Sequence, residues 1–153
     1  MREILFKAKR IDNGEWVEGH LFDNGFGEEE KKYFVGGLII EKYNGTACDD
    51  WDITGINFYE IDSETLCQFT GLCDKNGKKI WENDIVNHNG KYAPVKFGMY
   101  CSSFDCGKYN FGFYVDFPEE TFYRKELGYW CRKVEVAGDI FDNPELLQEK
   151  SDE

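Results

Sequence analysis

The chain has 153 residues, a formal net charge of −12 and an aromatic content of 17%. This length fits one domain, or two small lobes that share a core, and it buries enough surface to fold without a disulfide or metal staple. The apolar content of 41% excludes a disordered chain. The charge disfavours binding to phosphate backbones, unless the 18 basic residues cluster on one face.

Localisation and metal binding follow from what the sequence lacks. No stretch approaches the roughly 18 apolar residues that span a membrane, and strand-like residues follow Met1 where a signal peptide would place an apolar run. We therefore expect a cytoplasmic protein with no membrane partner. No cysteine pair has CxxC spacing, so free thiols are expected, with neither a bound metal nor a cofactor. The cysteines are Cys48, Cys67, Cys73, Cys101, Cys106 and Cys131.

The first half of the chain predicts antiparallel strands. Ile4, Phe6 and Ala8 alternate in a first strand over residues 2–10, and a turn at 12–14 leads to a second strand over 16–22. Two apolar runs, 33–35 and 38–40, predict a strand with a bulge or break at Gly36 and Gly37. A turn at 43–46 precedes a strand over 53–61, and Asp62 is placed to cap one helical turn.

The stretch Gln68–Asn87 carries most of the local structural information. Asp74-Lys75-Asn76-Gly77 predicts a type I′ hairpin turn, because Asn and Gly accept the positive φ values that this turn needs. A second turn follows at Glu82-Asn83-Asp84, where both acids are expected to stabilise the turn by bonding backbone N–H groups. The candidate site residues of this stretch, with a structural or an interaction role, are Phe69, Thr70, Gly71, Asp74, Asn76, Gly77, Ile80, Trp81, Glu82, Asp84, Ile85 and Val86.

The remainder of the second half continues the β pattern. Asn89-Gly90 predicts another hairpin, and two successive hairpins with short strands indicate a small, bent, SH3-like barrel. Residues 109–117 form an aromatic strand for a sheet core or a subunit interface, and Asn143-Pro144-Glu145 starts a short C-terminal helix. We expect a mainly β (α+β) chain that forms one domain, or two lobes with an N-terminal β region at 1–66 and a C-terminal barrel and helix at 67–153.

The motifs QFTGL, DKNGKKI and ENDIV, in this order, resemble the signature of the YopX protein family of phages and prophages. The segments around Tyr59–Thr65 and Val134–Leu147 resemble it too. Two positions depart from the family pattern, with Asn83 in place of the usual Gly and Cys73 in place of a charged residue. Asn is the next best residue for a positive φ, so the first departure keeps the turn. The resemblance implies a phage-encoded protein acting in the host cytoplasm, and it implies no particular reaction.

No catalytic constellation stands out, so three functions remain open. The first is a non-enzymatic regulatory or accessory module that binds a protein partner and self-associates as a homo-oligomer through its aromatic β surface. The second is a small barrel that binds nucleic acid on stacked aromatics. The third is an enzyme with an acidic or metal-assisted site, for which Glu82 and Asp84 are the paired carboxylates.

Overall fold

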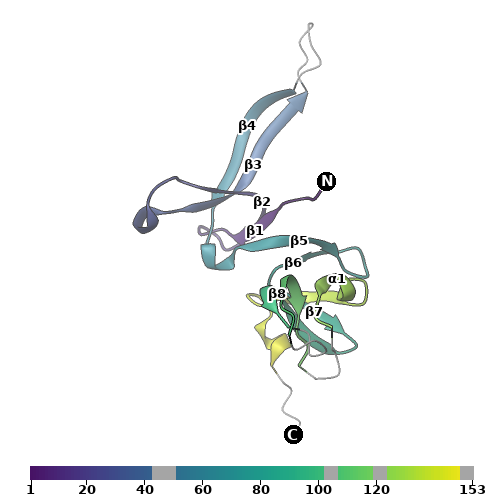
Figure 1. Cartoon of the computed structure of the whole chain (residues 1–153). Coiled ribbons are helices and arrows are strands. Elements are labelled where there is room, and N and C mark those ends of the chain that lie inside the picture. The colour runs from purple at the N-terminus through teal and green to yellow at the C-terminus, as the bar shows by residue number, and fades with distance from the viewer. Residues whose placement is uncertain (43–50, 102–106, 119–123, 149–153) are drawn as a thin grey trace. The chain divides into compact units, whose positions relative to one another are not determined.

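The computed structural model describes residues 1–42, 51–101, 107–118 and 124–148, so the turn predicted at 43–46 lies outside the described residues. The described chain consists mainly of antiparallel β-strands with one short α-helix, which confirms the expected class (Figure 1). It divides into two compact units. The N-terminal unit is Ile4–Gln68, and the C-terminal unit joins Met1–Glu3 to Phe69–Glu153.

The N-terminal unit is a sheet with the strand order β4-β3-β2-β1, and the first residues of β5 pair with the far side of β1. Its strands are β1 (Phe6–Lys9), β2 (Trp16–Asp23), β3 (Tyr33–Lys42), β4 (Trp51–Glu60) and the start of β5 (Cys67–Cys73). Two 3₁₀ turns connect them, η1 (Glu28–Glu30) and η2 (Ser63–Thr65). Asp62 caps the second turn by accepting the N–H of Glu64 at 3.0 Å, as the sequence predicts.

The core of the N-terminal unit is small. Its buried cluster consists of Ala8, Val35 and Ile61, with partly buried apolar side chains around it. The first strand begins at Phe6 rather than at Arg2, and Ile4 is 55% exposed instead of joining the core face. This unit therefore buries few large side chains and leaves many of its apolar side chains exposed.

Strand β3 passes through Gly36 and Gly37 without the bulge or break that the sequence predicts there. The register shift between β3 and β4 lies instead between Ile39 and Ile40. The glycine is needed for close strand approach, because a Cβ on Gly36 would collide with the backbone of Asn57 on β4. Gly36 thus marks a close approach of neighbouring strands rather than a bulge, whereas a Cβ on Gly37 would meet no atom closer than 3.9 Å.

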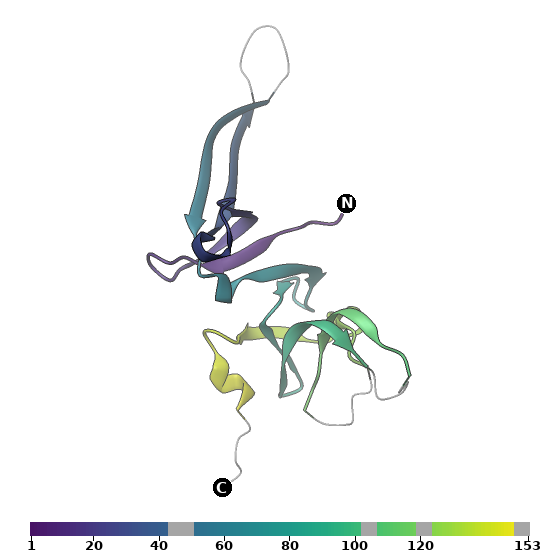
Figure 2. The ribbon, with the colours of Figure 1, turned by 60° about the vertical axis from the view of Figure 1, so that its left-hand side comes forward.

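The C-terminal unit contains a four-stranded sheet of order β10-β7-β8-β9, and the later part of β5 pairs with β6. Its elements are β6 (Lys79–Trp81), β7 (Asp84–His88), β8 (Lys91–Tyr100), β9 (Asn110–Val115), α1 (Leu127–Trp130), β10 (Glu135–Asp139) and the 3₁₀ turn η3 (Pro144–Leu147). Within the described residues these strands do not close into a barrel, so the SH3-like detail stays a prediction. Figure 2 shows the strands of this sheet from a second side.

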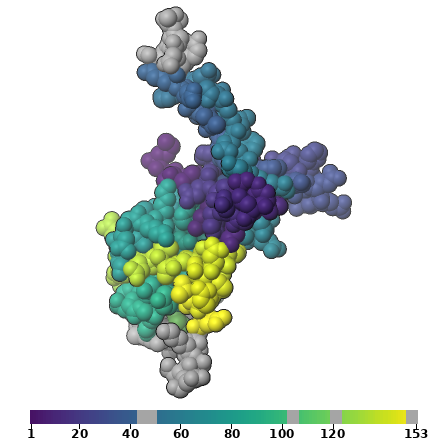
Figure 3. All heavy atoms as spheres, turned by 180° about the vertical axis from the view of Figure 1, so that it is seen from behind, coloured from purple at the N-terminus to yellow at the C-terminus, as the bar shows by residue number. Residues whose placement is uncertain are grey.

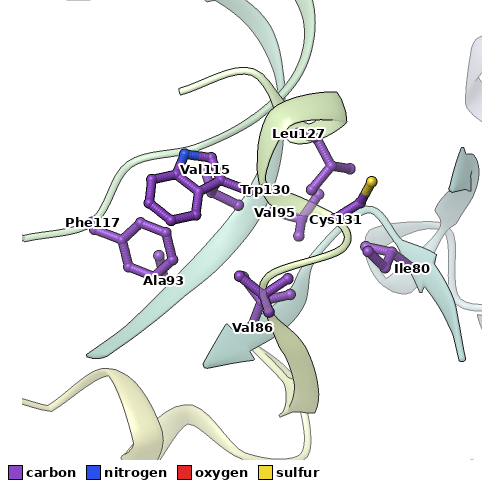
Figure 4. Close-up of a cluster of buried hydrophobic side chains, with 10 residues drawn as sticks. Ile80, Val86, Ala93, Val95, Val115, Phe117, Leu127, Trp130 and Cys131 are labelled. Carbon is purple, nitrogen blue, oxygen red and sulfur yellow. The ribbon is translucent and has the colours of Figure 1, made fainter. Parts of the chain in front are cut away.

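The larger hydrophobic core lies in the C-terminal unit, where α1 packs on the sheet (Figure 4). Leu127, Trp130 and Cys131 come from the helical segment, and they meet strand residues such as Val95 and Val115. The helix at the C-terminus is a single 3₁₀ turn, and Asn143 does not cap it with its side chain. The predicted start at Asn143-Pro144-Glu145 is confirmed, because Asn143 stands directly before the turn, and its side chain accepts the N–H of Asp139 at 3.3 Å.

Candidate interaction surfaces

The first candidate surface lies on a hairpin arm formed by β3 and β4. Pairing between β2 and β3 ends at Gly36, whereas β3 continues to Lys42 and stays paired with β4. We call residues 37–42 and 51–57 the arm. Figure 3 shows the paired strands in blue and teal as a narrow ribbon. Isolated two-stranded ribbons are marginally stable in water, so the arm gains stability only from a covering surface.

One face of the arm is apolar except for Lys42, which pairs with Trp51. Directly paired residues of an antiparallel ladder share a face, and Leu38 pairs with Ile56 while Ile40 pairs with Ile53. The register shift between these two pairs places Ile53 on the same face as Ile56, although the two are three positions apart. We call this surface the arm face; its residues are Leu38, Ile40, Trp51, Ile53, Ile56 and Phe58.

Every residue of the arm face is exposed, from 46% at Phe58 to 70% at Trp51. At about 200 Å² for a large apolar side chain, these fractions leave roughly 700 Å² of accessible surface on this face. A standard protein interface buries about 800 Å² on each partner, so the arm face has the size of a docking surface. A contiguous apolar patch of this area on a soluble chain marks a contact site.

Aromatic side chains at the root of the arm extend the same face onto β2. Phe22 pairs with Phe34, and the Phe58 ring lies 5.7 Å from Phe22 and 6.4 Å from Phe34, between ring centroids. Phe22 itself is 42% exposed. The apolar surface therefore continues from the arm onto the body of the N-terminal unit.

A second apolar surface lies on the hairpin of β8 and β9 in the C-terminal unit. Phe97 pairs with Phe113 and Met99 pairs with Phe111 on one face, which we call the β8–β9 stripe. The Phe97 ring lies 4.9 Å from Phe111 and 4.8 Å from Phe113. The stripe starts in the core beside Val95 and becomes exposed towards Met99 and Phe111, at 64% and 71%.

The signature turn is held by the carboxylate of Asp74. Its Oδ1 accepts the N–H groups of Asn76 and Lys78, and its Oδ2 accepts the N–H of Val136, all at 2.9 Å. Burial raises the pKa of Asp74, but hydrogen bonds from Val136, Lys78 and Asn76 outweigh it, so the pKa lies below its ordinary value. Asp74 is thus a charged acceptor that connects the turn to strand β10.

The turn geometry differs from the type I′ turn that the sequence predicts. Gly77 has a positive φ of 81°, but Asn76 does not, and the N–H of Gly77 bonds to the Asp74 carbonyl at 3.0 Å. The turn is therefore of type I followed by a left-handed glycine, the arrangement of three-residue hairpin loops. At the second turn, Asn83 has φ 68° and Asp84 accepts the N–H of Trp81 at 2.8 Å, as expected.

Most of the signature residues are buried. Among the candidate site residues, eight are buried: Phe69, Thr70, Asp74, Ile80, Trp81, Asp84, Ile85 and Val86. Phe69 and Trp81 contact each other with centroids 5.4 Å apart, and Thr70 donates to the Ile80 carbonyl at 2.7 Å. Gly71, Asn76, Gly77 and Glu82 lie at or near the turns. The structure thus brings the signature together as a folding unit, not as a pocket.

The remaining reactive side chains do not converge. His88 contacts the Trp130 ring at 5.0 Å, and His20 lines a hollow of about 360 Å³ in the N-terminal unit, together with Glu18. Within the described ranges, no three His, Cys, Asp or Glu side chains are arranged to hold a metal ion. Cys67, Cys73, Cys101 and Cys131 form no disulfide within the described residues. Cys48 and Cys106 lie outside the described residues.

A comparison with models of protein families shows to which family the chain belongs. A model of the family described as YopX protein matches residues 6–148, which is nearly the whole sequence. The chain belongs to the YopX protein family. No curated protein matches this YopX family member. The expectation from the signature motifs is therefore confirmed, and the fold described above is that of a YopX protein.

A solved structure illustrates the similarity in fold. The crystal structure of protein EF1440 from Enterococcus faecalis aligns with a TM-score of 0.54 and 18% sequence identity. The alignment covers 97% of this chain and all of the other. In the described part of the YopX chain, no helix has the length and apolar character needed to cross a membrane.

Proposed function

We propose that this YopX protein is a non-enzymatic interaction module that self-associates, and that it acts as an accessory or regulatory protein of a phage or prophage. The observation that carries the proposal is the arm face, which leaves six large apolar side chains exposed on a two-stranded ribbon. Family membership supports the phage setting. Two of the signature acids, Asp74 and Asp84, accept backbone N–H groups, which gives these carboxylates a role in the fold.

Protein is a better partner for this surface than nucleic acid. The chain carries a net charge of −12, which repels a phosphate backbone. Proteins that stack bases on aromatic side chains also track the backbone with basic residues, and strand β9 contains neither Lys nor Arg. A flat apolar face with charged residues at its ends is typical of the centre and rim of a protein interface.

The test is the mass of the purified protein by light scattering at micromolar concentration. We expect an oligomer of the 17.9 kDa chain. Ile56→Asp, which places a carboxylate in the arm face, should lower the mass towards one chain. The matched control is Asn57→Asp, the next residue along β4, which is exposed, belongs to the opposite face and gains the same charge. A wild-type protein that stays a single chain would refute the proposal.

A further inference from the structure

The chain exposes two apolar surfaces of the same kind, one in each unit. The arm face belongs to β3 and β4, and the β8–β9 stripe belongs to a second hairpin. Both are flat faces of antiparallel ribbons, and such faces pack on each other about 10 Å apart with their side chains interdigitated. We infer that the arm face of one copy docks on the β8–β9 stripe of a second copy, in a head-to-tail contact. This inference rests on the proposed self-association and specifies its geometry.

The sizes of the two surfaces match what an interface requires. On the stripe side, Phe97, Met99, Phe111 and the adjoining Tyr109 are 47–71% exposed. At about 200 Å² for a large side chain they offer roughly 500 Å². With roughly 700 Å² from the arm face, the contact would bury about 1,200 Å² in total, the lower limit of specific, stable interfaces.

Charge favours the head-to-tail arrangement over contact between like surfaces. The arm contains two acidic residues and one basic residue, Glu41, Asp52 and Lys42, for a net charge of −1. The described residues of the β8–β9 hairpin, 91–101 and 107–116, contain three basic residues and one acidic residue, for a net charge of +2. Two arms or two stripes facing each other would bring like net charges together, whereas the arm against the stripe brings opposite signs together.

The head-to-tail contact also uses each apolar surface once. If each surface paired with itself, one chain would carry two independent isologous contacts and neither apolar hairpin would cover the other. A heterologous contact covers the arm of one copy with the stripe of the next, and it closes into a ring when the rotation between copies permits. Each hairpin then becomes one layer of a two-layer β structure, which is stable where a lone ribbon is not.

Two complementary variants test this arrangement. Ile56→Asp removes the arm face and keeps the stripe, and Phe111→Asp removes the stripe and keeps the arm face. Each variant alone should run as a single chain by light scattering. Their equimolar mixture should form a complex of two chains, because the intact arm of one variant meets the intact stripe of the other. The double variant lacks both surfaces, so it should bind neither single variant.

Matched controls keep the result interpretable. Asn57→Asp and Asn110→Asp add the same charge at exposed positions next to the mutated residues, on the opposite faces of β4 and β9, and both should assemble as wild type does. Far-UV circular dichroism confirms that each variant folds. Single variants that still dimerise, or a mixture that stays single-chain beside an oligomeric wild type, would overturn the head-to-tail contact alone. A single-chain wild type would overturn the proposed function itself.

Discussion

Replacing Asp74 tests whether the family signature stabilises the fold by holding the turn and strand β10 together. The carboxylate accepts three backbone N–H groups and is 6% exposed. Hydrogen bonds to a charged acceptor contribute about 1.5–3 kcal/mol each, and buried donors left without a partner add a desolvation cost. Since such contributions are not additive, we expect Asp74→Ala to lower the free energy of unfolding of the C-terminal unit by about 3–5 kcal/mol.

Asp74→Asn is the sharper variant, because it keeps the shape and one carbonyl oxygen. The amide NH₂ then faces the Val136 N–H, or the pair of N–H groups at Asn76 and Lys78 if it is flipped. We expect a loss of about 1–3 kcal/mol, measured by urea unfolding. Fluorescence reports on this unit, because Trp81 and Trp130 are each 4% exposed within it.

The contribution of Asp74 to the free energy of unfolding should depend on pH, and its direction follows from the pKa. The pKa of Asp74 is lower in the folded protein than its ordinary value, so the ionised carboxylate stabilises the folded state more than the protonated carboxyl does. The stabilisation is complete above the unfolded pKa of about 3.9, and it is lost as the pH falls through the folded pKa. The difference between wild type and Asp74→Asn should therefore shrink on acidification below about pH 4.

Asp116→Asn is the matched control for this experiment. Asp116 lies in the same unit with a side chain that is 51% exposed, 3.3 Å from Lys125. Exposed ion pairs contribute about 0–1 kcal/mol, so this change should leave the unfolding curve nearly unchanged. The reasoning fails if Asp74→Asn is as stable as wild type at neutral pH, or if its deficit grows as the pH is lowered.

Substitutions at Asn83 and at Gly36 test backbone geometry. Asn83→Gly should match or exceed wild-type stability, whereas Asn83→Val should lose about 1–2 kcal/mol, because φ is 68° at this position; equal melting temperatures for the two variants would contradict this. Gly36→Ala should destabilise the N-terminal unit, since the added Cβ collides with the β4 backbone at Asn57. Gly37→Ala is its control, because the nearest atom to that Cβ is 3.9 Å away; the two variants should melt at clearly different temperatures.

Local turn chemistry made much of the fold predictable. Asn89 and Gly90 have φ values of 51° and 85°, so the two-residue hairpin expected from this dipeptide is present. The Asp74 turn was located correctly but assigned to the wrong type, because a carboxylate that collects three N–H groups stabilises a different backbone path. Asp74 receives one of these bonds from Val136, which is 62 residues away, and spacing along the chain gives no sign of such a partner.

The exposed surfaces were only partly predictable. The aromatic strand over 109–117 was expected in a core or at an interface, and the structure divides it, with Val115 buried and Phe111 exposed. The arm face was missed, because an apolar strand looks the same in sequence whether or not a neighbouring element covers it. A signal was present all the same. Leu38, Ile39 and Ile40 are consecutive apolar residues, whereas a strand with one solvent face alternates apolar and polar residues.

The signature and the arm face lie in different units, so we expect substitutions in the two to affect folding and the proposed self-association separately. The signature residues are mostly buried around two turns of the C-terminal unit, where substitution changes the free energy of unfolding. The arm face lies in the N-terminal unit, which buries a small core and leaves its larger apolar side chains exposed. A substitution there removes little packing from the folded chain. Its effect should therefore appear in the mass of the assembly and not in the unfolding curve of the single chain.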